Sequence, residues 1–210
     1  ADVGVIDTLR VTGTTLLRLN EDKTMNGIVW LDPATSLLNL GGHILTLNFA
    51  GLTPPAPLVH MNGGDIVNGL MTFNITGPEL VVLPDLIAAL PDITVNSPSN
   101  TTAEKLIISS MGQVGILTAN GTSNIDVQSA GDLAAPIAGV INNGTGTIDL
   151  QRAGDLYINA TGDLKAYSGL ILFSHASGPT GVDHLGNVLV DGGTVAFGVR
   201  DDNVIIHGNG

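Results

Sequence analysis

The segment NIDVQSAGDL at positions 124–133 recurs as TIDLQRAGDL at positions 147–156. Each copy places a short alternating run before an Ala-Gly-Asp-Leu phrase, and a shorter echo, TGDL, follows at positions 161–164. The offset is constant, since positions 126 and 133 of the first copy match positions 149 and 156 of the second. One turn of a β-helix is about as long as this offset between the two copies, which lies within the roughly 20–50 residues of repeat architectures. The repeat therefore predicts that successive windings lie on one another, with Ile125 beside Ile148.

Similar short runs fill the rest of the chain. They alternate polar and apolar residues or are wholly apolar, and Gly, Asn, Asp and Pro separate them, as is typical of strands joined by tight turns. The chain is 43% hydrophobic but only 3% aromatic, so Val, Ile, Leu and Ala have to fill the core. We expect an all-β fold, a β-solenoid (parallel β-helix) of many short strands. A β-sandwich or barrel of antiparallel strands is the alternative.

Two Pro-rich stretches, at 53–57 and 91–98, interrupt this pattern. We expect residues 1–98 to form an N-terminal β-rich part with these excursions, and residues 99–210 a regular β-stack, as two parts or as one continuous domain. Residues 79–90 fit either a strand that ends at Leu83 or a short helix that Pro91 would stop.

The charge and the apolar runs exclude two classes of partner. The net charge is −12 with only seven Lys and Arg residues, whereas binding to nucleic acid needs clustered basic side chains. No apolar run approaches the ~20 residues of a membrane-spanning helix. The chain starts at Ala1 rather than Met, as a mature chain does after removal of a signal peptide. We therefore expect an extracellular or cell-surface location.

Two further segments carry a resemblance to a known group. LNLGGHILTLN at 38–48 and GGDIVNGLMTF at 63–73 resemble coils of secreted parallel β-helix proteins, a group that includes pectate-lyase-like solenoids. The Ala-Gly-Asp-Leu phrases resemble the repeats of haemagglutinin-type adhesins, and the composition is similar to that of microbial extracellular filament, sheath or surface-layer subunits. The resemblance covers 36–78 and 124–207. It implies a fold and a surface role rather than a catalytic site.

The carboxylates most similar to an enzyme site are Asp201 and Asp202, close to His207. Cleavage of a glycosidic bond needs two carboxylates that flank the bond at a set separation. Neighbouring residues of a strand point to opposite faces, so this pair would share a site only at a turn. We expect no catalytic residue and no enzymatic activity. A polysaccharide lyase or hydrolase is the least favoured alternative.

No residue pattern indicates a metal or a cofactor. The histidines lack the spacing of a zinc site; they are His43, His60, His175, His184 and His207. Three aspartates follow Gly and precede Leu, as in turns, and binding of Ca²⁺ between coils is their alternative role; they are Asp132, Asp155 and Asp163. Five Asn-x-Thr triplets are candidate glycosylation sites: Asn74, Asn100, Asn120, Asn143 and Asn159.

A solenoid has an unpaired strand edge at each end, and such edges can pair with another chain. Candidate strands lie near both termini, at 3–11 and 203–207. We expect a structural subunit that self-assembles into a homopolymer, a filament, sheath or surface layer, through exposed strand edges or strand donation. The alternative is an adhesin that binds a host surface or a glycan. An ice-binding solenoid would show regular Thr-x-Thr rows, and the sequence has none.

Overall fold

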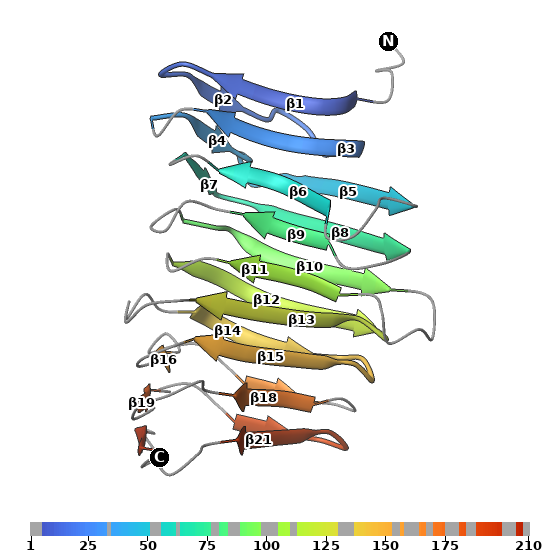
Figure 1. Ribbon diagram of the computed structural model, residues 1–210, viewed down its shortest axis with the longest axis vertical. Helices are drawn as coiled ribbons and strands as arrows, with labels where there is room; N and C mark the ends of the chain where they lie inside the picture. Colours follow the sequence, from blue (N-terminus) through green and yellow to red (C-terminus); the bar gives the residue numbers. More distant parts are fainter. Residues whose placement is uncertain are drawn as a thin grey trace.

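The chain winds around one axis, and successive windings add parallel strands to two long faces and, over part of the length, to a third (Figure 1). The computed structural model describes residues 6–32, 35–50, 56–61, 64–76, 80–83, 89–97, 105–109, 113–129, 137–152, 156–157, 164–166, 170–174, 181–183, 188–198 and 205–207. Within these residues every element is a strand, and all the strand pairs are parallel. The fold is thus an all-β solenoid, as predicted, and the antiparallel alternative is wrong.

Two long faces share β3 (Lys23–Asp32), whose first part pairs with β5 and whose last part pairs with β6. Face 1 continues with β5 (Ile44–Ala50), β8 (Leu70–Thr76), β10 (Asp92–Ser97), β12 (Val114–Gly121), β14 (Ile137–Asn142), β17 (Leu164–Ala166) and β20 (Val188–Val190). Face 2 consists of β1 (Ile6–Thr12), the end of β3, β6 (Ala56–Met61), β9 (Leu80–Leu83), β11 (Lys105–Ser109), β13 (Asn124–Ser129), β15 (Thr147–Arg152), β18 (Leu170–Ser174) and β21 (Thr194–Gly198).

Face 3 is shorter and consists of two small sheets. One contains β2 (Leu16–Arg18), β4 (Leu37–Asn39) and β7 (Asp65–Val67). The other contains β16 (Leu156–Tyr157), β19 (Gly181–Asp183) and β22 (Ile205–His207). Where face 3 has a strand, the chain visits face 2, face 3 and face 1 in turn, and from β8 to β15 the described strands alternate between face 1 and face 2. Equivalent strands of successive windings therefore lie side by side.

The repeat that predicted the fold has the predicted register. Ile125 of β13 pairs with Ile148 of β15, and Asp126 pairs with Asp149, so the offset between the two copies is one winding. The next windings of the same face continue this order, because Ile148 pairs with Ile171 and Ile171 pairs with Val195. The prediction of stacked windings is confirmed.

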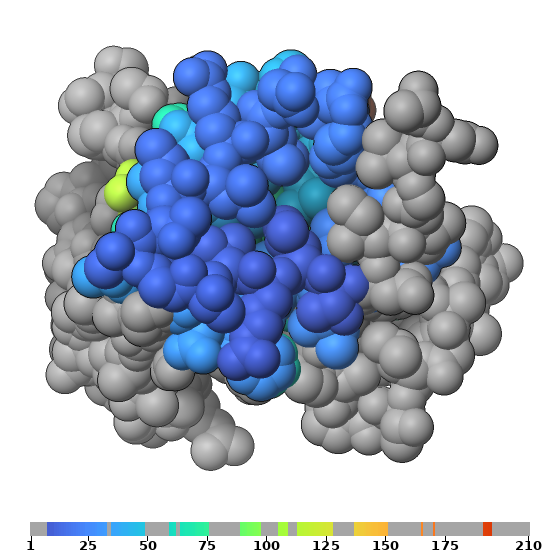
Figure 2. Space-filling model, turned by 90° about the horizontal axis from the view of Figure 1, so that it is seen from above, coloured from blue at the N-terminus to red at the C-terminus, as the bar shows by residue number. Residues whose placement is uncertain are grey.

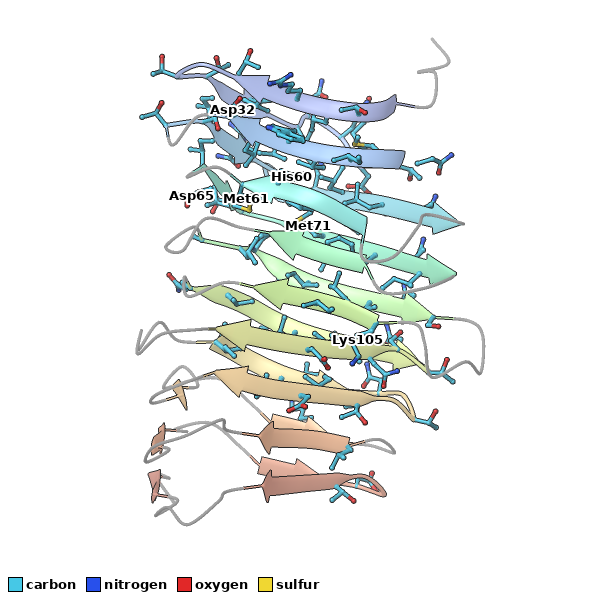
Figure 3. All side chains as sticks on the ribbon, viewed as in Figure 1. Asp32, His60, Met61, Asp65, Met71 and Lys105 are labelled. Carbon is cyan, nitrogen blue, oxygen red and sulfur yellow. The ribbon has the colours of Figure 1, made fainter. Side chains whose placement is uncertain are left out.

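The core consists of the inward side chains of these strands. In β5, for example, Leu45 and Leu47 are fully buried, while Thr46 between them faces outward and is partly exposed. Phe73 is the largest fully buried side chain, and Met71 on the same strand also points inward (Figure 3). Each such burial contributes about 1.5–3 kcal/mol. The core is therefore a column of aliphatic layers, as the scarcity of aromatic residues predicts.

Polar side chains bind the turns of one winding to the next. The carboxylate of Asp92 accepts a hydrogen bond from the Ile116 N–H at 2.8 Å, and Asp22 and Asp65 act in the same way on the next winding. At the corner after β12, Gly121 has a φ of 66°. A Cβ there would collide with the Ser97 carbonyl oxygen of the winding before. The Gly, Asn and Asp residues that the sequence places in turns therefore also form contacts between adjacent windings.

The strand predicted at the start of the segment 79–90 is present, because Leu80–Leu83 forms β9 between β6 and β11. Residues 84–88 lie outside the described residues. Across the boundary expected at residue 98, β10 pairs with β12, and Asn96 lies opposite Asn120.

Candidate functional site

The N-terminal end of the solenoid exposes strand edges and part of the core. Within the described residues β1 pairs only with β3, and β2 pairs only with β4. Leu9, Leu17 and Leu19 are only partly buried there, although they pack against the core. Figure 2 looks down the axis onto this end. We call these two strands and three leucines the N-terminal rim.

Leu9 and Leu17 of the rim are partly exposed because of their position in the first winding, since residues of similar type in the next winding are buried. Leu17 lies in register with Leu38 of the next winding, which is fully buried. Leu9 lies in register with Val29, which is also fully buried. The same apolar columns therefore continue into the first winding, and among the described residues Leu9 and Leu17 have a strand neighbour on one side only.

The other end presents the same three faces. There β20, β21 and β22 pair with β17, β18 and β19 respectively, and with no further strand among the described residues. Since all the strand pairs of a face are parallel, both ends offer edges that run in the same direction. We call β20, β21 and β22 the C-terminal rim.

Face 1 carries two rows of polar side chains on its outer surface. The register aligns one row of threonines and, two residues further along each strand, one row of asparagines. The threonine row is Thr24, Thr46, Thr72, Thr94 and Thr118; the asparagine row is Asn48, Asn74, Asn96 and Asn120. We call these two rows the Thr–Asn face.

The asparagines are joined by hydrogen bonds between their side chains. Each Nδ2 donates to the Oδ1 of the asparagine one winding before, at 2.6 Å from Asn74 to Asn48, 2.9 Å from Asn96 to Asn74 and 2.8 Å from Asn120 to Asn96. Asn143, in the turn after β14, extends the ladder with a 3.0 Å bond to Asn120. The ladder fixes the side-chain orientation along half of the solenoid.

Three of the candidate glycosylation sites are members of this ladder. A glycan would be attached to the same Nδ2 atoms that donate from Asn74, Asn120 and Asn143. Asn143 is exposed, whereas Asn74 and Asn120 are half-buried. The ladder uses one of the two Nδ2 hydrogens, so a glycan on Asn74 or Asn120 would have to replace the other one, and glycosylation at these half-buried positions remains a prediction. Asn100 and Asn159 lie outside the described residues.

A second cluster lies on the outer surface of face 2, where the rings of Trp30 and His60 stack with centroids 4.0 Å apart. The Arg10 guanidinium lies 5.6 Å from the Trp30 ring centroid, and it also forms an ion pair of 3.3 Å with Asp32. Burial lowers the pKa of His60 (labelled in Figure 3) and so favours its neutral form. The stacking of His60 on Trp30 packs β6 against β3 on the outer surface of face 2.

Lys105 and Asp126 form an ion pair of 2.8 Å between β11 and β13 on the same face (Figure 3). Within the described residues, no group of three or more His, Asp or Glu side chains converges as a metal site would require. Asp201 and Asp202, the carboxylates most similar to an enzyme site, lie outside the described part of the chain. So do the calcium candidates, Asp132, Asp155 and Asp163, and two histidines, His175 and His184.

Comparisons of the chain with protein-family models, with curated proteins and with solved structures gave no match. The fold itself agrees with the resemblance to parallel β-helix proteins. None of the described residues belongs to a helix that could span a membrane.

The sequence alone did not predict the Thr–Asn face, because each winding contributes only a Thr-apolar-Asn tripeptide to it. The tripeptides are TMN at 24–26, TLN at 46–48, TFN at 72–74, TVN at 94–96 and TAN at 118–120. Their spacing along the chain is uneven, so no fixed period shows it. A search for Thr-apolar-Asn triplets, with strand-like neighbours, would have found them.

Proposed function

We propose that the protein is an extracellular structural subunit that self-assembles end to end into a filament, sheath or surface layer. The observation that carries the proposal is the N-terminal rim, where the strand edges and the leucines of the last core layer are left without a neighbouring winding among the described residues. An unpaired edge with an apolar layer behind it is a template for another strand. Repeat proteins stay soluble as monomers when polar caps cover such ends.

The geometry of the two rims suits a second copy of the chain as the occupant. A copy in the same orientation would place its β21 beside β1 on face 2 and its β22 beside β2 on face 3. Both contacts are parallel strand pairs, like those inside the molecule. Because the two surfaces differ and one copy uses each once, the contact is head-to-tail and extends without limit unless a rotation closes it.

The test compares two single substitutions by Lys in strand β2, one on its outward side and one on the side that faces the core. Leu17 packs against the core and is partly buried, whereas its neighbour Leu16 points outward and is 61% exposed. Wild type, L16K and L17K are compared by sedimentation velocity and negative-stain microscopy over a wide range of concentration. Circular dichroism checks that each chain is folded.

We expect oligomers or filaments that grow with concentration for wild type and L16K. L17K should need about tenfold more protein or should stay monomeric, because a charge at a desolvated contact costs at least about 1.4 kcal/mol. Wild-type chains that stay monomeric at every concentration would contradict the proposal. Equal behaviour of L16K and L17K would contradict the role of the rim.

A further inference from the structure

The Thr–Asn face is a two-dimensional array with a constant repeat. Neighbouring strands of a sheet lie about 4.8 Å apart, and residues i and i+2 of one strand lie about 6.6 Å apart. Thr46, Thr72, Thr94 and Thr118 therefore repeat in one direction at the strand spacing, and each faces its own asparagine in the other direction. The result is a grid of hydroxyl, methyl and amide groups on a regular sheet.

The grid is held rigid from behind and from the side. The residues that alternate with the array are buried core side chains; they are Leu45, Leu47, Met71, Phe73, Ile93, Val95, Leu117 and Ala119. Threonine is β-branched, so its χ1 angle is restricted in a strand. The ladder bonds restrict the asparagine amides. Such preorganisation lowers the entropy cost of binding.

Each asparagine of the ladder keeps hydrogen-bonding capacity for an external partner. A side-chain amide has two N–H donors and an oxygen with two lone pairs, and the ladder uses one donor and one lone pair of Asn74, Asn96 and Asn120. The remaining donors and acceptors repeat at the strand spacing. They are thus arranged to fix a row of water molecules at the same repeat.

The column two residues before the threonines is mainly apolar, but it also contains Asp92, which is exposed, lies in register with Leu70 and accepts a hydrogen bond from the Ile116 N–H. Two residues before the threonines of β5 and β12 lie Ile44 and Ile116, which are 37% and 36% exposed and are two of the three exposed large hydrophobic side chains among the described residues. Apolar groups order the water next to them and gain free energy when that water is released or shared. The surface therefore combines groups that order water with groups that anchor it.

The charge of the face indicates what kind of partner it suits. The chain has a net charge of −12, but the two rows consist only of Thr and Asn. An ionic partner would find no opposite charge in these rows. A polysaccharide chain would normally stack on aromatic rings, and neither row contains one. An uncharged, periodic lattice of hydrogen-bond donors and acceptors matches the rows in both charge and repeat.

We propose that the Thr–Asn face binds the ordered water lattice of ice. An ice-binding solenoid is expected to carry regular Thr-x-Thr rows, which the sequence lacks. In this proposal the paired rows of Thr and Asn have that role instead. Ice is a partner whose own surface is an uncharged, regular lattice of hydrogen-bonded oxygen atoms. This binding uses face 1, so it is independent of the rims and of end-to-end assembly.

The experiment measures inhibition of ice recrystallisation, and uptake of the protein into a growing ice hemisphere, for three chains. The test variant is T72K/T94K, which places two long charged side chains in the middle of the array. The matched control is I107K, a half-buried outward residue of β11 on face 2, where Lys would lie beside Asp126. Circular dichroism near 0 °C and sedimentation verify folding and assembly state in each chain.

We expect wild type and I107K to enter the ice and to inhibit recrystallisation. T72K/T94K should need about tenfold more protein or more, because many weak contacts act together in an array. A folded wild-type chain that is excluded from ice would overturn the proposal. Equal loss in I107K and T72K/T94K would overturn the assignment to this face. Should T72K/T94K unfold, T94K alone takes its place under the same criteria.

Discussion

The first winding and the interior windings are built from the same kind of strand, yet they bury their leucines differently. Leu17 of β2 and Leu38 of β4 are paired in register on face 3, and only Leu38 is fully buried. The two positions have the same residue type and the same direction. The difference between them is the presence of a neighbour on one side or on both. For this pair of leucines, full burial therefore depends on having a described strand on both sides, although Val11 of the terminal strand β1 is buried as well.

The largest effect that tests this comparison is expected for the leucine pair itself. Leu38→Ala should lower the free energy of unfolding by about 2–5 kcal/mol, because it leaves a cavity that the windings on both sides enclose. Leu17→Ala should cost about 1 kcal/mol, because part of its surface is already in water. Urea titrations of the two variants, under conditions where the chain is monomeric, measure both values. An equal decrease in the free energy of unfolding for Leu17→Ala and Leu38→Ala would show that the N-terminal rim is covered in solution.

The sequence contains enough information for the interior but not for the rim. The repeat between 124–133 and 147–156 predicts the pairing of Ile125 with Ile148, because successive coils there have nearly equal lengths. The winding that joins Val29 to its partner Val59 is longer, so the N-terminal coils do not share that period. That Leu17 ends a column whereas Leu38 continues it follows from the three-dimensional order of the strands. No local pattern distinguishes the two leucines.

The same reasoning explains why the repeat was found and the Thr–Asn face was not. A repeat as long as NIDVQSAGDL is visible by itself, whereas Thr94-Val95-Asn96 resembles many strand tripeptides. Its meaning depends on the register that places Asn96 beside Asn74 and Asn120. Register is set over the whole strand by the buried alternate residues. The fold class could thus be predicted from composition and repeat, whereas the Thr–Asn face depends on the three-dimensional register of the strands.

The turns allow a second test, since a glycine with positive φ occurs both at the rim and in the interior. Gly13 has a φ of 79° and Gly121 a φ of 66°. A Cβ at Gly13 would have Thr15 Oγ1 as its nearest neighbour, at 3.8 Å, whereas at Gly121 it would collide with the Ser97 carbonyl. Both substitutions by Ala carry the backbone cost of placing a Cβ at positive φ, about 1–2 kcal/mol. Only Gly121→Ala adds overpacking against the adjacent winding, about 1–3 kcal/mol more.

Thermal or urea unfolding of Gly13→Ala and Gly121→Ala gives this difference directly. It isolates the neighbouring winding, because the backbone term is common to both chains. A Gly13→Ala chain as unstable as Gly121→Ala would mean that another winding packs against the first one. Under dilute conditions that result would place a second molecule or an additional segment on the N-terminal rim.

The smallest effect is expected in the asparagine ladder, which also has end and interior members. Asn96 donates to Asn74 and accepts from Asn120, whereas among the described residues Asn48 only accepts, from Asn74. Asn96→Ala removes two hydrogen bonds and should cost about 1–2 kcal/mol; Asn48→Ala removes one and should cost about half as much. The half-buried amides left behind can bind water, which keeps both losses small. Urea titration of the two variants measures the ratio, and a ratio of one would mean that the ladder bonds add nothing to the stability that strand pairing already supplies.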